Sequence, residues 1–260
     1  AKYELKNLFP EVPVTSLFST PKPSLLIRYL LTLASEHDSI IMDFFSGSAT
    51  TADAVMQQNI EDGGKRRWIL VQISEMCDDS NEFFQSICDM GTERIRRAGD
   101  RIKQEHPDAD IDIGFKVFRT ADTNIKWNSL MDLGQIDISQ LEYTPDLLDF
   151  MPDAKDIDIV YELMLRQRDV ALSEKMEQLS DIGDRTYLYA SSYLVCRETE
   201  ITENLVSKLA ELDPLPIKFI FRDSAFKDDI ALKDETFRRL KALIEKNAGT
   251  NKPTYTVEFI

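Results

Sequence analysis

The sequence predicts an α/β fold in which a doubly wound parallel sheet, present in part, is followed by a smaller α/β domain. Two short apolar runs, residues 40–42 and 68–73, have the length of buried parallel strands, and a helical pattern follows each of them. The first run leads to Asp43 and the second to Glu75. Because such sheets bind ligands at the carboxyl ends of their strands, these two acids mark the expected site.

Composition sets the class of protein. The chain has 260 residues, of which 43% are hydrophobic, enough for two modest cores. Its apolar runs are too short to cross a bilayer and no charged-then-apolar leader is present, so we expect a cytoplasmic protein without membrane contact. The three cysteines, Cys77, Cys88 and Cys196, are too scattered for a disulfide framework or a zinc site, and we predict no metal.

Charge is distributed unevenly along the chain. The net charge is −15, and residues 121–260 account for −10 of it, with 17 basic and 27 acidic side chains. An acidic surface of this kind repels a phosphate backbone. We therefore expect the second half to contribute little to nucleic-acid binding.

The first half shows the following order of elements. Residues 1–20, which contain Pro10 and Pro13, predict an irregular arm, and a helix with one apolar face begins at Pro23 and ends near His37. A long helix is expected over 81–104, with an arginine row that includes Arg94 on its solvated face, and a strand over 114–119.

The second half has its own α/β pattern. Residues 121–153 lack a sustained period, so we predict a cofactor-binding domain over 1–125, a linker over 126–153 and a carboxyl-terminal domain over 154–260. The elements expected in the last domain are helices over 156–168, 203–212 and 236–246, a hairpin of 186–189 with 193–196, and strands over 217–221 and 255–260.

The turn after Asp43 carries most of the functional signal. Gly47 permits a tight exit from the strand, Ser48 can cap the helix that follows, and we expect that helix to start at Ala49. Asp43 repels phosphate and no Gly-Lys-Ser/Thr follows, which argues against a phosphate-binding loop. Any strand-turn-helix crossover has a similar pattern, so Asp43 can equally be a turn acid.

Two further residues indicate which chemical groups the ligand carries. Glu75 is placed to accept the hydroxyls of a ribose, and Lys22, just before the first helix, can pair with a carboxylate. Asp43 suits an ammonium group. S-adenosylmethionine carries all three groups and is the expected cofactor, although Glu75 as a solvated strand end and Lys22 as a surface lysine remain alternatives.

Three segments resemble a known family. Thr20-Pro21-Lys22-Pro23, the run from Asp43 to Ala52, and Trp68-Ile69-Leu70-Val71-Gln72 look like motifs X, I and II of amino-DNA methyltransferases in the β-class order. Residues 4–9, 114–118 and 221–229 resemble more narrowly the modification subunit of bacterial type III restriction-modification systems, a DNA (adenine-N6) methyltransferase. The chain looks like the carboxyl-terminal half of such a subunit.

The resemblance implies a methyltransferase-like sheet, S-adenosylmethionine as cofactor, double-stranded DNA and the restriction subunit as partners, and a homodimer. The cofactor-binding residues it implies are Lys22, Asp43, Phe44, Phe45, Gly47, Ser48, Thr50, Thr51 and Glu75. The chain departs from the family at Ala49, where glycine is usual, and it contains no Asp-Pro-Pro-Tyr motif IV. We therefore name no catalytic residue, and expect the chain alone to be inactive.

Two other functions fit the same residues. One is a non-catalytic cofactor half-site joined to a dimerisation module, and the other is a fragment of an RNA or small-molecule methyltransferase. The segment over 221–229 argues against the latter, because it resembles the type III carboxyl-terminal domain.

Overall fold

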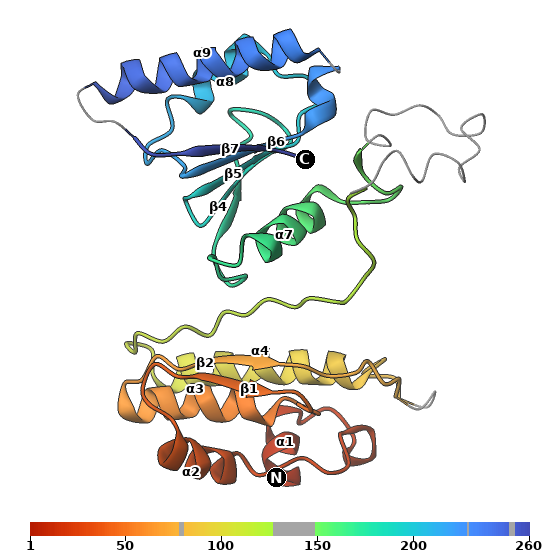
Figure 1. Ribbon diagram of the computed structural model, residues 1–260. Helices are drawn as coiled ribbons and strands as arrows, with labels where there is room; N and C mark the ends of the chain where they lie inside the picture. The colour runs from red at the N-terminus through yellow and green to blue at the C-terminus, as the bar shows by residue number, and fades with distance from the viewer. Residues whose placement is uncertain (78–80, 127–148, 228, 250–252) are drawn as a thin grey trace. The chain divides into compact units, whose positions relative to one another are not determined.

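The chain divides into two compact units, Ala1–Phe118 and Arg119–Ile260 (Figure 1). The structure is a computed structural model, and it describes residues 1–77, 81–126, 149–227, 229–249 and 253–260. Most of the predicted linker over 126–153 lies outside the described residues.

In the described part of the first unit, the sheet consists of two parallel strands. Strand β1 (Ile40–Asp43) pairs with β2 (Arg67–Leu70), and Asp43 lies opposite Leu70. The parallel pairing predicted from the two apolar runs is confirmed. Because the strands run in the same direction and end in register, the turn after Asp43 and the segment after Leu70 leave the sheet at the same edge.

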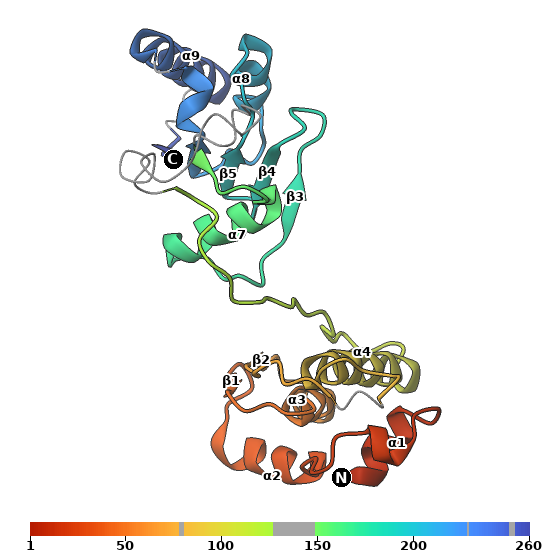
Figure 2. The same cartoon turned by 90° about the vertical axis from the view of Figure 1, so that its right-hand side faces the viewer.

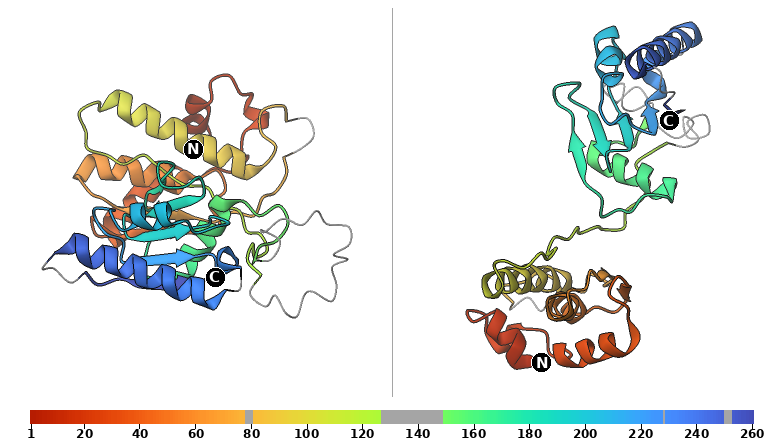
Figure 3. Two further views of the ribbon diagram at one scale, coloured as in Figure 1. Left: turned by 90° about the horizontal axis from the view of Figure 1, so that it is seen from above. Right: turned by 90° about the vertical axis from the view of Figure 1, so that its left-hand side faces the viewer.

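Three helices pack against one face of this sheet. Helix α3 (Thr50–Asp62) packs against both α2 (Ser24–Ala34) and α4 (Ile87–Glu105), as Figures 2 and 3 show. Along each strand alternate side chains are partly buried; Ile41 and Trp68 pack against the contact between α2 and α3. This period of two is the pattern of a strand covered on one side.

The other face of the sheet and one face of α2 are exposed. The exposed side chains on the strands include Ile40, Met42 and Ile69. The apolar face predicted for α2 is formed, but its residues are exposed as well; they are Leu25, Leu26, Tyr29, Leu30 and Leu33. Only Ser24 and Leu31 of this helix are buried.

The amino-terminal segment corrects one expectation. Residues 1–20 are not an irregular arm, because Lys2–Leu8 form helix α1 and Val14–Ser16 form the 3-10 helix η1. Leu5 and Phe9 are fully buried in the same core as α4. Pro10 does not disrupt this helix, because it follows Phe9, where the helix has already ended.

Two further elements of the first unit differ from the prediction. The long helix starts at Ile87 rather than at residue 81, because Ser86 caps it: the Ser86 hydroxyl accepts from the Asp89 amide and the Asp89 carboxylate accepts from the Ser86 amide. Residues 114–119 do not form a strand. Ile113 and Phe115 nevertheless pack against the core, and the Phe115 ring centroid lies 6.0 Å from that of Trp68.

The second unit is a three-layer α/β structure around a five-stranded sheet. The strand order is β3 (Met176–Gln178), β4 (Thr186–Tyr189), β5 (Tyr193–Cys196), β6 (Lys218–Phe221), β7 (Thr256–Phe259). Strand β4 is antiparallel to both of its neighbours, β3 and β5, whereas β5, β6 and β7 run parallel to one another. Figure 1 shows helices on both sides of the sheet.

Each face of this sheet buries its own core. Helices α8 (Glu203–Leu209) and α9 (Ile230–Ala248) cover one face, which includes Phe219 and Phe221, and α7 (Asp156–Gln167) covers the other, which includes Ile220. The predicted hairpin, helices and strands are confirmed, apart from shifted ends: α8 is shorter, and α9 begins earlier because Asp229 caps it. The antiparallel strand β3 was not predicted.

Candidate cofactor site

The candidate site is the turn that connects β1 to α3. Gly47 and Ala49 in this turn have positive φ values of 51° and 59°, and the Ala49 amide donates to the Ser46 carbonyl over 2.8 Å. Left-handed backbone is natural for glycine and unfavourable for alanine. The two residues reverse the chain so that α3 starts at Thr50, one residue later than predicted.

Asp43 is bonded within this turn. One carboxylate oxygen accepts from the Phe45 amide over 3.1 Å, and the other accepts from the Thr51 hydroxyl over 2.5 Å. Its place at the end of a strand is as predicted, and it is also the turn acid of the alternative interpretation. A carboxylate has about four acceptor positions, so these two bonds leave room for an ammonium donor.

Gly47 lies between two groups that the sequence did not indicate. Its amide donates to the side-chain oxygen of Gln72 over 2.8 Å, which ties the turn to the segment after β2. A Cβ atom built on Gly47 would lie 3.2 Å from the ring of Phe18. A side chain at this position would therefore meet both an unfavourable φ and a crowded ring.

Ser48 does not cap α3, which corrects the prediction. The residue before the helix is Ala49, and no side chain caps the first turn. Ser48 and Thr50 are buried and instead accept hydrogen bonds from Arg94. Arg94 was expected on a solvated face, yet it is fully buried. The first amides of α3 are thus left without a side-chain acceptor.

The other predicted residues lie around this turn or apart from it. Phe44 and Phe45 follow Asp43 directly, and both side chains are largely exposed, with ring centroids 5.3 Å apart. Lys22 and Glu75 are exposed, and among the described residues neither side chain forms a hydrogen bond or ion pair with Asp43. The hydrogen bonds of the structure thus join Asp43 to the turn and to Thr51, and do not include the side chains of Lys22 and Glu75.

The segment that carries Glu75 is attached to the start of α4. The Glu75 carbonyl accepts from the Ile87 amide over 3.0 Å, and Met76 bridges Ser86 in antiparallel fashion. This segment leaves the sheet at the same edge as the Asp43 turn, because β1 and β2 are parallel and end in register.

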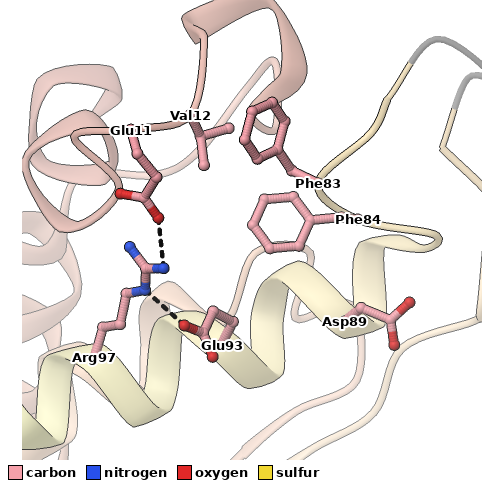
Figure 4. Close-up of a pocket in the computed structure, with 7 residues that line it drawn as sticks. All are labelled: Glu11, Val12, Phe83, Phe84, Asp89, Glu93 and Arg97. Carbon is pink, nitrogen blue, oxygen red and sulfur yellow. Dashed lines mark hydrogen bonds and ion pairs between the residues drawn. The ribbon is translucent and has the colours of Figure 1, made fainter.

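A cavity of about 290 Å³ lies beside α4, and none of the predicted site residues lines it. Figure 4 shows Arg97 between Glu11 and Glu93, with 2.6 Å separating the paired atoms on each side. Hydrogen bonding from Arg96, together with Arg97, lowers the pKa of Glu93 to about 2. Arg97 and the two glutamates of this cavity are already paired with each other, and Asp89 accepts from Ser86, so the cavity is a poor candidate for the cofactor.

Comparison with known proteins identifies the first part of the chain. Residues 2–85, which include β1, the turn and β2, match the profile of the N6/N4 methyltransferase family, described as DNA methylase. The matched region contains Lys22, Asp43, the turn and Glu75. The match implies a Rossmann-like methyltransferase fold, of which the first unit holds two parallel strands and their helices.

Proteins similar to this chain include modification subunits of type III restriction-modification enzymes. The chain is 36% identical to the type III restriction-modification enzyme StyLTI Mod subunit of Salmonella typhimurium over 142 residues, 53% of this chain and 21% of that protein. It is 36% identical to the EcoPI Mod subunit of Escherichia phage P1, over 47% of this chain and 19% of that protein, and 32% identical to the EcoP15I Mod subunit of Escherichia coli, over 46% and 18%. The aligned part spans about a fifth of each relative.

No described helix has both the length and the apolar character needed to cross a membrane. In the described residues, no group of three histidine, cysteine or carboxylate side chains is arranged to hold a metal ion.

The sequence analysis did not identify Gln72, Phe18 and Arg94 as residues that hold the turn, because each of them contacts the turn from a position distant in sequence.

Proposed function

We propose that residues 1–125 supply the S-adenosylmethionine side of a DNA (adenine-N6) methyltransferase site of the type III modification kind. The observation that supports this most strongly is the position of the turn. Asp43 ends a parallel strand, two left-handed residues follow, and α3 then begins without a side-chain cap. This is the part of an open α/β sheet where nucleotide-like ligands bind, and it lies within the matched methylase region.

Each polar group of the cofactor has a proposed partner. Asp43 accepts the amino-acid ammonium, Glu75 accepts the ribose hydroxyls, and Lys22 pairs with the carboxylate. The backbone of the turn lines the methionine portion; its residues are Phe44, Phe45, Gly47, Ser48, Thr50 and Thr51. Opposite charges and charge-assisted hydrogen bonds of this kind orient a ligand strongly.

The cofactor supplies a methyl group that its sulfonium already activates. The contribution of this chain is therefore to bind and orient the cofactor, and the proposed acids achieve this without transferring a proton. Motif IV, which the resemblance assigns to the adenine amine, is absent from these 260 residues. For that reason we assign no catalytic residue to the chain, and we expect it to be inactive on its own.

Calorimetric titration with S-adenosylmethionine tests the proposal. We expect a full-length subunit containing this sequence to bind the cofactor and the 260-residue chain to bind it weakly or not at all, because part of the pocket is absent and Ala49 replaces the usual glycine. Asp43→Asn in the full-length subunit should weaken binding, whereas Asp38→Asn, before β1, should not. Tight binding by the short chain would contradict the expected division of the site, and unaltered binding by Asp43→Asn would contradict the role of the acid.

We also propose that the region over 154–260 is an assembly domain that pairs two modification subunits and meets the restriction subunit, without reading DNA. Its support is the net charge of −10 over residues 121–260 and the folded sheet of the second unit, which buries an apolar core on each face. Helix α9 offers an exposed surface for this contact, whereas the hairpin of β4 and β5 is buried inside the sheet and does not.

Deletion of residues 154–260 from the full-length subunit separates these roles. We expect light scattering to show a loss of dimer mass while DNA affinity in a filter-binding or anisotropy assay is retained. Unchanged dimer mass with lost DNA binding would show that the domain has a different role.

A further inference from the structure

Arg94 connects α4 to the Asp43 turn from the buried side. Its Nη1 donates to the Thr50 hydroxyl over 2.6 Å, and to the hydroxyl and carbonyl of Ser48 over 3.3 and 3.4 Å. Its Nε and Nη2 both donate to Oδ2 of Asp53, over 3.3 and 3.0 Å. One planar guanidinium therefore joins three positions that span the end of the turn and the first turn of α3.

The pair formed by Arg94 and Asp53 is almost completely removed from water. The side chains are 0% and 2% exposed. The second carboxylate oxygen of Asp53 is also used, because it accepts from Gln57 over 2.6 Å and from Arg101 over 3.3 Å. The arrangement is thus a closed hydrogen-bonded network in a low-dielectric environment, where the geometry of each bond matters most.

Stability alone does not account for such a pair. Burying two charges costs about as much as their attraction returns, and well-packed apolar replacements are often neutral or stabilising. A buried ion pair is therefore better explained by a requirement for one particular geometry. The group whose geometry depends on Arg94 is the turn.

Asp43 restrains the front of the turn through Phe45 and Thr51, and the end of the turn is held by neighbouring elements. Gly47 and Ala49 are both left-handed, and no side chain caps α3. From the side of β2, Gln72 holds the Gly47 amide. From the side of α4, Gly91 packs so closely that a Cβ atom there would lie 3.3 Å from the Gly47 carbonyl oxygen, and Arg94 follows three residues later on the same helix.

We propose that Arg94 is a positioning residue, which holds the turn in the conformation that the proposed cofactor site requires and itself contacts no ligand. The expected effect on cofactor affinity rests on the proposed function. The expected effect on the conformation of the turn does not, and it is tested separately. Without the Arg94 contacts, Ser48 and Thr50 lose their donors and the turn is free to leave its left-handed conformation.

The test uses a charge-neutral double variant, because removing one partner would leave a buried charge and unfold the unit. Arg94→Met with Asp53→Asn removes the pair and keeps an acceptor for Gln57 and Arg101. The matched control is Arg66→Met with Asp62→Asn. Arg66 and Asp62 form an ion pair of the same 3.0 Å length, at the opposite end of α3.

Amide hydrogen exchange measured by NMR is the first readout. In the Arg94 and Asp53 variant, we expect the Gly47 and Ala49 amides to exchange on the order of tenfold faster, while the Val55 amide in the middle of α3 keeps its rate. The control should leave the Gly47 and Ala49 amides unchanged. Unaltered exchange at these two amides, or equal acceleration along all of α3, would overturn the proposal.

Cofactor affinity of the full-length subunit is the second readout. The Arg94 and Asp53 variant should bind S-adenosylmethionine on the order of tenfold more weakly than the Arg66 and Asp62 control. If the unaltered subunit does not bind the cofactor, the proposed function fails while the exchange result still decides the role of Arg94. Should the double variant fail to fold, Arg94→Lys keeps the charge and loses the planar fork, and the same two amides should again exchange faster.

Discussion

Ala49 holds a conformation that glycine would adopt more easily. Its φ of 59° and ψ of 36° are left-handed, which costs alanine about 1–2 kcal/mol, whereas its buried methyl group contributes about 0.8 kcal/mol. We predict that Ala49→Gly raises the free energy of unfolding of the first unit by about 0.5 kcal/mol in urea denaturation. Ala52→Gly, buried inside α3, is the control and should lower it by about 1 kcal/mol or more. Equal losses in both variants would show that the turn is unstrained.

Glu93 makes the stability of the first unit depend on pH. Hydrogen bonds from Arg96 and Arg97 lower its pKa from 4.5 to about 2. Because the folded pKa is the lower one, the stabilisation is complete above pH 4.5 and is lost as the pH falls toward 2. The difference in unfolding free energy between the unaltered protein and Glu93→Gln should therefore shrink over that range.

Urea denaturation at several pH values between about 2 and 6 measures this difference. Glu105→Gln, at the exposed end of the same helix, is the control and should change stability little throughout. If the difference in unfolding free energy between the unaltered protein and Glu93→Gln stays constant over this pH range, the stability does not depend on the protonation of Glu93.

At this scale the sequence predicted which residues lie in the turn but not how they are held. Asp43 and Gly47 could be recognised because a strand end and a tight turn are local features. Arg94 could not, since its partner Asp53 lies 41 positions earlier and periodicity alone assigned it to a solvated face. Ser48 was misassigned for the same reason, because a distant guanidinium takes the hydroxyl that would otherwise cap α3.

At the scale of elements, the start of α4 depends on one reciprocal pair. Ser86 and Asp89 form a capping box, and Ser86 is 4% exposed. We predict that Ser86→Ala lowers the free energy of unfolding of the first unit by about 1 kcal/mol, because the Asp89 amide loses its acceptor. Ser86→Thr keeps the acceptor and should lose much less. Thermal or urea denaturation measures both, and equal losses would show that the cap is unimportant.

The elements of the second unit could be predicted because their periodicity is local and strong. Strands β4, β5 and β6 are short apolar runs buried on both faces, and α9 has a clear amphipathic pattern. The first unit was harder. The prolines that follow helix α1 made its segment look irregular in the sequence. Residues 114–119 have the alternating pattern of a strand but do not form one.

For the whole molecule, we predict two separate unfolding transitions. The units Ala1–Phe118 and Arg119–Ile260 have their own buried cores. Phe219→Ala, at a fully buried site in the second unit, should cost about 3–5 kcal/mol and shift one calorimetric transition. Leu5→Ala in the core of the first unit should shift the other. A single transition that moves with both variants would show that the units unfold together.

The exposed apolar face of the first unit has a consequence for how the chain behaves in solution. Of the 24 large apolar side chains exposed in the described residues, 18 belong to this unit. Such surfaces attract one another, and the net charge of −15 supplies the repulsion that keeps copies apart. Solubility should therefore depend on the balance between apolar attraction and charge repulsion. Moderate salt screens the charge and mild acid reduces it, so we expect the chain to self-associate under these conditions before either unit unfolds.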